Sequence, residues 1–520
     1  MNIFDIIGPI MIGPSSSHTA GAVRIAAMAR SLLGQEPVRA NIVLFGSFAQ
    51  TGEGHGTRLA LLGGLLGLDV SDPSIAHSDE LARQRGLQVT FEQSADEPRH
   101  PNTAGLELTD AQGGVLTVTG VSLGGGRVQI TDIDGIEVQI RSDTAALVLF
   151  HTDTTGVLAS LTRVFASQGV NIASMSDFRE RRGGRAIAVF EIDTMADEEL
   201  RRALVALPHV HHVVALPGSV ADDGPGGNAL SLAQLAERAQ ERGVAISQIV
   251  LEEEAARAGA GPELVLEELK PYLSAMRQSV DEGLRSGERS RSGLSGGDAQ
   301  AVARHGGSLL GPLFGTLVAR AMAAPECNAR MGRVVASPTA GSCGVLPAVL
   351  LTMADITRCD DEALLRALAT AGGVGLAIAR RATLAGAAGG CQAECGSAAS
   401  MAAAAAVELA GGSPEAAVHA AALAMKGQMG LTCDPVGGLV EVPCVKRNGF
   451  SATAAFTAAE MALSGVRSVV PPDEVIEAMR DTGRRLPREL RETAQGGLAL
   501  SSVGRRVDEW LKSNDPASHS

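Results

Sequence analysis

Short runs of alternating apolar and polar positions dominate the first third of the chain. Successive side chains of a β-strand point to opposite faces, so this alternation predicts strands and hairpins. The alternating runs occupy residues 38–49, 87–93 and 114–140. Apolar residues instead recur with helical spacing over 19–34 and 56–68, and the first of these helices should end at Gly34. The pattern predicts an α+β domain over residues 1–143.

Two further regions and their connections follow along the chain. Residues 144–216 are expected to form strand, helix, strand, strand, helix and strand, which is the pattern of a split βαβ sandwich. A linker rich in Gly and Pro is predicted over 217–230. Beyond it the chain is rich in Ala, Leu and Glu, which predicts an all-α domain over 231–512, and we expect a disordered tail over 513–520. The expected fold is therefore multi-domain, with α+β, βαββαβ and all-α parts.

The composition restricts the classes of protein. The chain has 520 residues, of which 45% are hydrophobic and only 2% aromatic, so a large core must be built mainly from Ala, Leu and Val. A formal net charge of −14 argues against nucleic-acid or acidic-membrane partners. The N-terminus lacks the basic region of a signal peptide, and the Ala-rich stretches are interrupted by Gly, Glu and Pro. We therefore expect a cytoplasmic protein without a membrane span.

The middle region carries a recognisable turn. The stretch "DTTGVLASLTRVFASQGVNIASM" has an Asp-x-x-Gly-x-Leu turn into a helix and then a Gly-Val-Asn-Ile return. With its strand order, the whole segment 144–216 resembles an ACT domain. That resemblance implies a unit that binds an amino acid, regulates an attached enzyme and pairs between subunits. We therefore expect at least a homodimer, or a higher homo-oligomer.

Cysteines are the candidate chemical groups of the C-terminal region. The chain has seven cysteines, an odd number, which disfavours a disulfide framework in a cytoplasmic protein and favours metal or catalytic roles. Cys433 and Cys444 lie in a loop with Asp-Pro and Pro as neighbours, and Cys391 follows two glycines before an Ala-rich helix. There is no C-x-x-C pair, so a zinc ribbon or thioredoxin motif is not supported. Spacing alone leaves a metal site and scattered structural cysteines equally open.

The remaining cysteines are interpreted differently. Cys327 and Cys359 have no companion motif and are expected to be structural. Cys343 lies in a Ser/Thr/Gly loop that leads into an apolar helix. Free backbone N–H groups and hydroxyls at such a place suit a carboxylate, so the loop rather than the thiol is the candidate.

Five motifs together carry a resemblance along nearly the whole chain. They are "IGPSSSHTAG", "GEGHGT", "SPTAGSCGVLPAVL", "GGCQAECGSAASMAAA" and "GLTCDPVGGLVEVPCVKRN". Their order resembles the iron–sulfur L-serine dehydratase family, in a single-chain form with β portion, ACT domain and α portion. The resemblance implies a 4Fe–4S cluster held by Cys391, Cys433 and Cys444, with Cys395 as a neighbour and the first substitute. Three ligands leave one iron open as a Lewis acid for a dehydration that yields pyruvate and ammonia from L-serine.

The same resemblance implies roles for residues outside the cysteine motifs. His55 is the preferred base for the α-proton, and His18 is a substrate-binding or second catalytic group. His100 also matches a family motif, with a less defined role. The expected substrate-binding residues are Ser15, Ser16, Ser17, Thr19, Asn102, Ser337, Thr339, Gly341 and Ser342.

Three alternatives remain open. A pyridoxal-phosphate lyase would run the same net reaction but needs a lysine Schiff base, and none of the four lysines has a recognisable setting. A non-catalytic amino-acid sensor built on the ACT unit is the second. The third is a zinc-dependent lyase using the same three cysteines. No cysteine follows Cys444 in the sequence, so we do not expect the self-inhibition by a C-terminal cysteine that some members of the family use.

Overall fold

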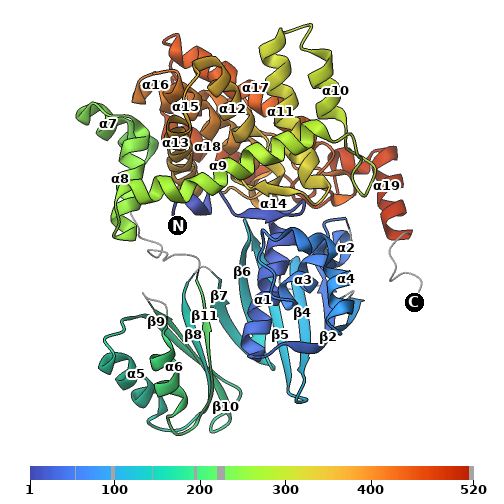
Figure 1. The fold of residues 1–520 in the computed structure, drawn as a ribbon, viewed down its shortest axis with the longest axis vertical. Coiled ribbons are helices and arrows are strands. Elements are labelled where there is room, and N and C mark those ends of the chain that lie inside the picture. The colour runs from blue at the N-terminus through green and yellow to red at the C-terminus, as the bar shows by residue number, and fades with distance from the viewer. Residues whose placement is uncertain are drawn as a thin grey trace. The chain divides into compact units, whose positions relative to one another are not determined.

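The structure is a computed structural model that describes all residues except 53, 95, 97–99, 143, 193–195, 219–228 and 514–520. The predicted disordered tail and most of the predicted linker lie outside the described residues. The chain divides into two compact units. We call Met1–Ser16, Glu53–His55 and Asn228–Ser520 the helical unit, and Ser17–Gly52 with Gly56–Gly227 the mixed unit (Figure 1).

A six-stranded sheet is the first part of the mixed unit. Its strand order is β3-β2-β4-β5-β6-β7, with β2 and β3 parallel and the other pairs antiparallel. The strands are β2 (Pro37–Phe45), β3 (Gln88–Gln93), β4 (Asn102–Asp110), β5 (Val115–Gly124), β6 (Arg127–Ile133) and β7 (Ile136–Arg141). The predicted run over 114–140 thus becomes a three-stranded meander. Its buried and exposed positions alternate, as the sequence pattern required.

Helices cover one face of this sheet. They are α1 (Gly21–Leu33), α2 (Gly46–Thr51), α3 (Thr57–Leu65) and α4 (Ser78–Gln84). The helix α1 packs on β4, β5 and β6, and α3 packs on α1. Gly34 ends α1 in the left-handed region at φ 78°, and its N–H is hydrogen-bonded to the carbonyls of Arg30 and Ser31. This helix and its end agree with the prediction, because glycine adopts that conformation without a Cβ penalty.

The second part of the mixed unit is a four-stranded antiparallel sheet with the order β11-β8-β10-β9. Its elements in chain order are β8 (Ala146–Thr152), α5 (Val157–Ser167), β9 (Ile172–Arg179), β10 (Arg185–Ile192), α6 (Glu198–Val205) and β11 (Val210–Leu216). Both helices pack on one face of this sheet, around a core that includes stacked Phe165 and Phe190. The order of strands and helices is the one expected from the sequence.

The helical unit is built around an alanine-rich core. Its helices are α7 (Leu232–Arg242), α8 (Ile246–Ala258), α9 (Pro262–Arg285), α10 (Asp298–His305), α11 (Pro312–Ala329), α12 (Val345–Thr357), α13 (Asp361–Arg381), α14 (Gly386–Gly389), α15 (Ser397–Leu409), α16 (Pro414–Lys426), α17 (Cys444–Leu463), α18 (Pro472–Arg485) and α19 (Ser502–Ser513). The helix α15 is buried on all sides and packs against α12, α13, α16 and α17. Small side chains let these helices approach closely, which is why the core needs few aromatic residues.

The first sixteen residues belong to the helical unit. Ile3, Ile6 and Ile7 lie in its core, and β1 (Ile10–Ile12) pairs antiparallel with β12 (Arg333–Val335). A Cβ on Gly372 would lie 2.8 Å from the Cβ of Ile3, so the N-terminal turn packs directly on the backbone of α13. The predicted α+β domain over 1–143 therefore contributes its N-terminal segment to the other unit.

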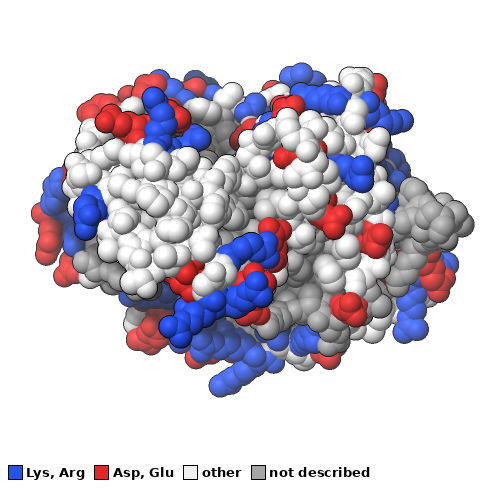
Figure 2. Space-filling model, turned by 90° about the horizontal axis from the view of Figure 1, so that it is seen from below, with Lys and Arg blue, Asp and Glu red and all other residues white. Residues whose placement is uncertain are grey.

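Two apolar segments meet the length and hydropathy of a membrane span, although the sequence was expected to contain none. They are Ala340–Thr357 and Asp361–Arg381, and 67% and 78% of their most apolar windows are buried inside the protein. Such burial is typical of core helices in a soluble domain. On the surface that Figure 2 shows, acidic and basic side chains are interspersed around broad uncharged areas.

Candidate functional site

Three buried thiols pack together in the helical unit. Cys391, Cys395 and Cys433 form one cluster, with Leu431 against it. Cys444 is also buried, and its charge contributes to the pKa of both Cys395 and Cys433. The three cysteines expected as ligands and their expected neighbour therefore lie in one region. All seven cysteines of the chain are free.

Cys391 stands at the beginning of a helical segment. Gly390 precedes it at φ 76°, and a π-helical turn over Gln392–Gly396 runs from it into α15. Both the nitrogen and the oxygen of the Gln392 side-chain amide form hydrogen bonds that hold this turn in place. Its Nε2 donates to the carbonyls of Gly389 and Met479 at 2.9 and 3.0 Å, and its Oε1 accepts the N–H of Gly430 at 2.9 Å. The amide thereby links the Cys391 turn to the segment that carries Cys433.

Backbone hydrogen bonds fix Cys433 in an extended position. Its N–H donates to the carbonyl of Leu490 at 2.9 Å, and its carbonyl accepts the N–H of Glu492 at 2.7 Å. Arg447 supports the same loop by donating to the carbonyl of Thr432 at 2.6 Å and to Asp434 at 2.8 Å. The thiol is thus held by groups far away in the sequence, from 490–492 and from α17.

Cys444 is the first residue of α17, and Asn448 one turn later supports it. The Nδ2 of Asn448 donates to the carbonyls of Cys444 and Gly341, both at 2.8 Å, and its Oδ1 accepts the N–H of Gly344 at 2.9 Å. One buried amide therefore joins the Cys444 helix to the loop that was predicted to bind substrate.

Burial and negative neighbours dominate the electrostatics of the thiols. Burial, and then the charges of Glu394, Glu492 and other thiols, raise the pKa of Cys433 well above its usual value. A hydrogen bond to Cys391, and then burial, do the same for the pKa of Cys395. Burial also raises the pKa of Cys444. These thiols stay protonated at neutral pH unless a positive charge compensates them.

Glu394 is a half-buried carboxyl between the thiols and the predicted substrate loop. Its Oε1 accepts the hydroxyl of Thr339 at 2.7 Å, and its Oε2 lies 3.8 Å from the Sγ of Cys433. Burial raises the pKa of Glu394 despite these contacts and the nearby charge of Arg447. Burial alone would lower the pKa of Arg447, but the charges of Cys391 and Asp434 raise it above its usual value. Burial therefore favours the protonated form of the Glu394 carboxyl.

The predicted substrate loop is buried and internally hydrogen-bonded. Ser337, Thr339 and Ser342 are each at most 5% exposed. The Ser342 hydroxyl bonds the carbonyls of Ser337 and Thr339 at 3.2 and 3.3 Å. The Ser337 hydroxyl is buried without a hydrogen-bond partner among the described residues. At Gly341 a Cβ would approach Glu394 Oε1 to 3.4 Å, so this side of the carboxyl is formed by glycine backbone.

Two N-terminal motifs reach the helical unit. Asn328 donates from Nδ2 to the carbonyl of Pro14 at 3.0 Å and to that of Ala340 at 3.4 Å, so Pro14 lies beside the Thr339 loop. Ser15 and Ser16 follow it and are buried. A Cβ on Gly54 would lie only 1.9 Å from Leu439, in the loop between Cys433 and Cys444. His55 is the next residue and is 3% exposed.

His18 lies in the mixed unit, on a π-helical turn over Ser16–Ala20 that precedes α1. Its Nε2 is hydrogen-bonded to the Ser47 hydroxyl at 2.9 Å, and its Nδ1 to the Ser17 hydroxyl at 3.1 Å. The ring also meets Phe48 edge to face, with centroids 5.2 Å apart. Thr19 beside it is fully buried. Both ring nitrogens are therefore held by hydroxyls.

Asn102 and His100 lie near Ser47 in the same unit. The N–H of Ser47 donates to the carbonyl of Pro101 at 2.7 Å, and Asn102 forms a β-bridge with Gly46. The N–H of Asn102 donates to Nδ1 of His100 at 3.2 Å, and burial lowers the pKa of that imidazole. Asn102 is thus brought beside the Ser47 loop that holds His18.

The predicted residues fall into two sets. The helical unit contains the four cysteines, the Thr339 loop, Ser15, Ser16 and His55, whereas the mixed unit contains Ser17, His18, Thr19, His100 and Asn102. The sequence analysis missed several polar residues that support the predicted residues within one set or the other. They are Ser47, Asn328, Gln392, Glu394, Arg447, Asn448 and Glu492. Gln392, Arg447 and Asn448 stand within the cysteine motifs, so their position was a signal, whereas nothing near Glu492 or Asn328 marked them.

The arrangement of the candidate ligands, which are the buried cysteines, differs from that of a site for a single metal ion. Among the described residues, no group of three His, Cys, Asp or Glu side chains is placed to hold one metal ion. The buried thiols nevertheless gather in one place, beside glycines. A Cβ on Gly386 would lie 2.5 Å from Glu394 and 3.3 Å from the sulfur of Cys433. The thiol region is therefore lined on one side by backbone without side chains.

Comparisons with known proteins match each of the three parts of the chain to a known family. The chain matches the family models "Serine dehydratase beta chain" over residues 2–132, "ACT domain" over 145–209 and "Serine dehydratase alpha chain" over 241–499. It is 33% identical to L-serine dehydratase of Streptomyces coelicolor, over 97% of this chain and 99% of that protein. It is 30% identical to L-serine dehydratase 2 of Escherichia coli, over 97% and 99%. The probable L-serine dehydratase alpha chain of Bacillus subtilis is 46% identical, over 54% of this chain and 93% of that protein.

Proposed function

We infer that this chain, which belongs to the serine dehydratase family in its single-chain form, is an L-serine ammonia-lyase that converts L-serine to pyruvate and ammonia. The observation that carries the assignment of the site is the gathering of buried Cys391, Cys395 and Cys433 beside the Glu394–Thr339 pair. A β-elimination needs a base for the α-proton and an acid for the leaving hydroxyl. The helical unit contains buried groups suited to both requirements.

The thiol set suits a 4Fe–4S cluster held by Cys391, Cys433 and Cys444. Thiolates are the ligands of such clusters, and an iron–sulfur cluster separates its ligands more widely than a single ion does. The positive charge of a bound cluster would also offset the cost of burying the thiolates away from water. When bound through three ligands, the cluster supplies a Lewis acid that polarises the substrate hydroxyl.

The residues of the chain have distinct tasks in this proposal. His55 removes the α-proton of serine, and half-buried Glu394 is a further group that can hold a proton near the leaving hydroxyl. Ser15, Ser16 and the loop of Ser337, Thr339, Gly341 and Ser342 offer hydroxyls and N–H groups for the carboxylate and ammonium. Elimination of water gives aminoacrylate, which hydrolyses to pyruvate and ammonia. Burial of these loops keeps bulk water away from the α-carbon.

The mixed unit contributes the other predicted groups. We assign His18 to substrate binding or to a second catalytic step, with Ser17, Thr19 and Asn102 as polar groups of the same set. The hydroxyls of Ser47 and Ser17 on its two ring nitrogens support an orienting task. We assign amino-acid-dependent regulation and homodimer or higher assembly to the ACT domain, and a cytoplasmic location suits free thiols.

One anaerobic experiment tests the proposed function. Protein reconstituted with iron and sulfide should form pyruvate from L-serine and show a broad absorbance near 400 nm that air removes, with about four irons per chain. The same protein loaded with zinc should be inactive. Iron-loaded protein without pyruvate formation would favour an amino-acid sensor, and a sharp aldimine band would favour a pyridoxal-phosphate enzyme.

A further inference from the structure

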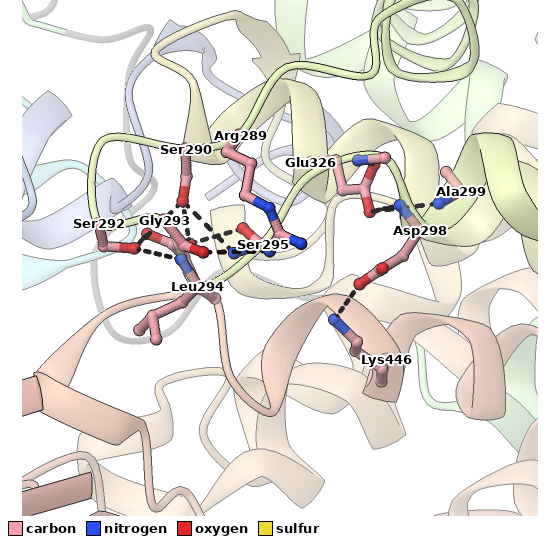
Figure 3. Close-up of polar contacts among 12 residues, drawn as sticks. Arg289, Ser290, Ser292, Gly293, Leu294, Ser295, Asp298, Ala299, Glu326 and Lys446 are labelled. Carbon is pink, nitrogen blue, oxygen red and sulfur yellow. Dashed lines mark hydrogen bonds and ion pairs between the residues drawn. The ribbon is translucent and has the colours of Figure 1, made fainter. Parts of the chain in front are cut away.

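A segment far from the cysteine motifs in sequence lies against the loop between Cys433 and Cys444. We call residues 286–297, which connect α9 to α10, the serine strap. Its turn is closed by backbone hydrogen bonds from Ser290 N to Ser295 O at 2.9 Å and from Gly293 N to Ser290 O at 3.0 Å. The Ser292 hydroxyl accepts the N–H of Leu294 at 3.1 Å. Three serine hydroxyls are thereby gathered on one side of the turn (Figure 3).

All three hydroxyls bind one carboxylate. Glu441 stands three residues before Cys444 and is 4% exposed. Its Oε2 accepts the hydroxyls of Ser290 and Ser295, both at 2.6 Å, and its Oε1 accepts that of Ser292 at 2.8 Å. A buried carboxylate is costly without such partners, so its position depends on the strap.

The strap also holds the other side of Cys444. Lys446, two residues after that cysteine, forms an ion pair with Asp298, which follows the strap as the first residue of α10. Figure 3 shows these two side chains pointing toward each other. Glu326 of α11 fixes this end, because its carboxylate accepts the N–H groups of Gly297, Asp298 and Ala299 at 3.0, 2.9 and 3.2 Å. Anchors therefore flank Cys444 in sequence on both sides.

The geometry points to Glu441 as a positioning residue for the Cys444 thiol, acting through the serine strap. This inference rests on the proposed function, in which Cys444 is a cluster ligand. Backbone hydrogen bonds close the loop from 434 to 443 on itself, among them Val436 N to Val442 O and Glu441 N to Leu439 O, both at 2.8 Å. Fixing Glu441 near the end of that loop fixes the direction in which α17 begins, and with it the direction of the thiol. Partners beyond the first ligand shell typically change metal affinity or activity about 10–100-fold.

The chain offers a matched control for Glu441. Glu326 is also fully buried, and it also accepts three hydrogen bonds, from the strap's last residue and the beginning of α10, but it lies outside the cysteine loop. Glu441→Ala and Glu326→Ala should both lower the thermal stability. The change at Glu441 should alter the behaviour of Cys444 much more, because Glu326 is linked to Cys444 only through the exposed Asp298–Lys446 pair.

The test measures thiol reactivity and cluster retention in the full chain. Reduced, metal-free protein is alkylated with iodoacetamide, and mass spectrometry compares the rate at Cys444 with that at Cys391. Glu441→Ala should raise this ratio about tenfold, and Glu441→Gln, which keeps one acceptor oxygen, should raise it less. In iron-loaded protein, Glu441→Ala should lose its absorbance in air about tenfold faster than wild type. Glu326→Ala reaches Cys444 only through the exposed Asp298–Lys446 pair and should change both quantities less than about twofold.

Two results would overturn the inference. One is an unchanged alkylation ratio in both Glu441 variants, and the other is an equal change in Glu326→Ala, which would indicate general loosening of the unit. If Glu441→Ala does not fold, Glu441→Gln and Ser292→Ala decide by the same ratio. Failure of wild-type protein to bind any cluster would count against the proposed function, while the alkylation ratio would still decide this inference.

Discussion

The thiol region of the helical unit and the His18 region of the mixed unit differ in the kinds of groups that surround their functional side chains. Around Cys433 the structure gathers thiols with Glu394 and Glu492, and burial opposes every negative charge there. Around His18 two hydroxyls are hydrogen-bonded to the two ring nitrogens. The first arrangement requires a positive partner to become ionised, whereas the second only fixes a ring. A cofactor is therefore expected at the thiols and orientation at the histidine.

The two regions also differ in the origin of their rigidity. The thiols are held by side-chain amides that bind backbone groups, as Gln392 and Asn448 do. His18 is hydrogen-bonded to the hydroxyls of Ser17 and Ser47, each of which makes one contact with one ring nitrogen. Loss of one support should consequently disturb the thiol region more than the His18 region.

Removal of a thiol should have the largest effect. Cys391→Ala removes one expected ligand, and we expect loss of activity by more than about a hundredfold, together with loss of the absorbance near 400 nm. Cys359→Ala is the control, because this half-exposed thiol lies outside the cluster of buried cysteines. Iron analysis and an anaerobic pyruvate assay measure both effects. Equal iron content in the two variants would contradict the difference drawn between the thiols.

Replacement of His55 and of His18 should have the next largest effects, and the two effects on the kinetics should differ. His55→Ala should lower kcat about 10²–10⁴-fold, the usual contribution of a general base, while the absorbance near 400 nm stays unchanged. His18→Ala should lower kcat less and raise KM, because its ring is assigned to orientation. Exchange of the α-proton of serine with deuterium distinguishes the two, since only the base is required for it. Persistence of that exchange in His55→Ala would transfer the role of base to another group.

The smallest of the expected effects is a dependence of the free energy of unfolding on pH, caused by Glu492. Burial and then the charge of Glu394 raise the pKa of Glu492 to about 8, from an ordinary 4.5. A raised pKa means that its contribution is fully present below pH 4.5 and disappears as the pH rises through 8. Metal-free protein should therefore lose stability between pH 5 and 8, with Glu492 contributing less than about 1.4 kcal/mol per pH unit because it is only partly buried.

Glu492→Gln provides the comparison for this effect. Urea unfolding at several pH values should give a flatter dependence in the variant than in wild type. A matched change at an exposed carboxyl of the mixed unit, Glu36→Gln, should keep the wild-type slope. Identical slopes in wild type and Glu492→Gln would show that this carboxyl is ionised throughout the range.

Hydrophobic periodicity predicted those helices and strands whose bounds depend on neighbouring residues alone. The end of α1 at Gly34 and the meander over 114–140 came directly from helical and alternating periodicity. The N-terminal residues were harder. Ile3, Ile6 and Ile7 look like the beginning of the α+β domain, yet they are buried in the helical core. Hydrophobic spacing shows that a residue is buried but does not show which partner buries it.

The sequence by itself determined the family, the three-part layout and the cysteines to consider, because these depend on motifs and their order. Tertiary structure decided which polar groups support them. Glu394 meets Thr339 across 55 positions of sequence and Glu441 meets Ser290 across 151. Contacts of such long range arise only when the helices have packed, since a carboxylate can be buried only where the completed fold supplies its donors.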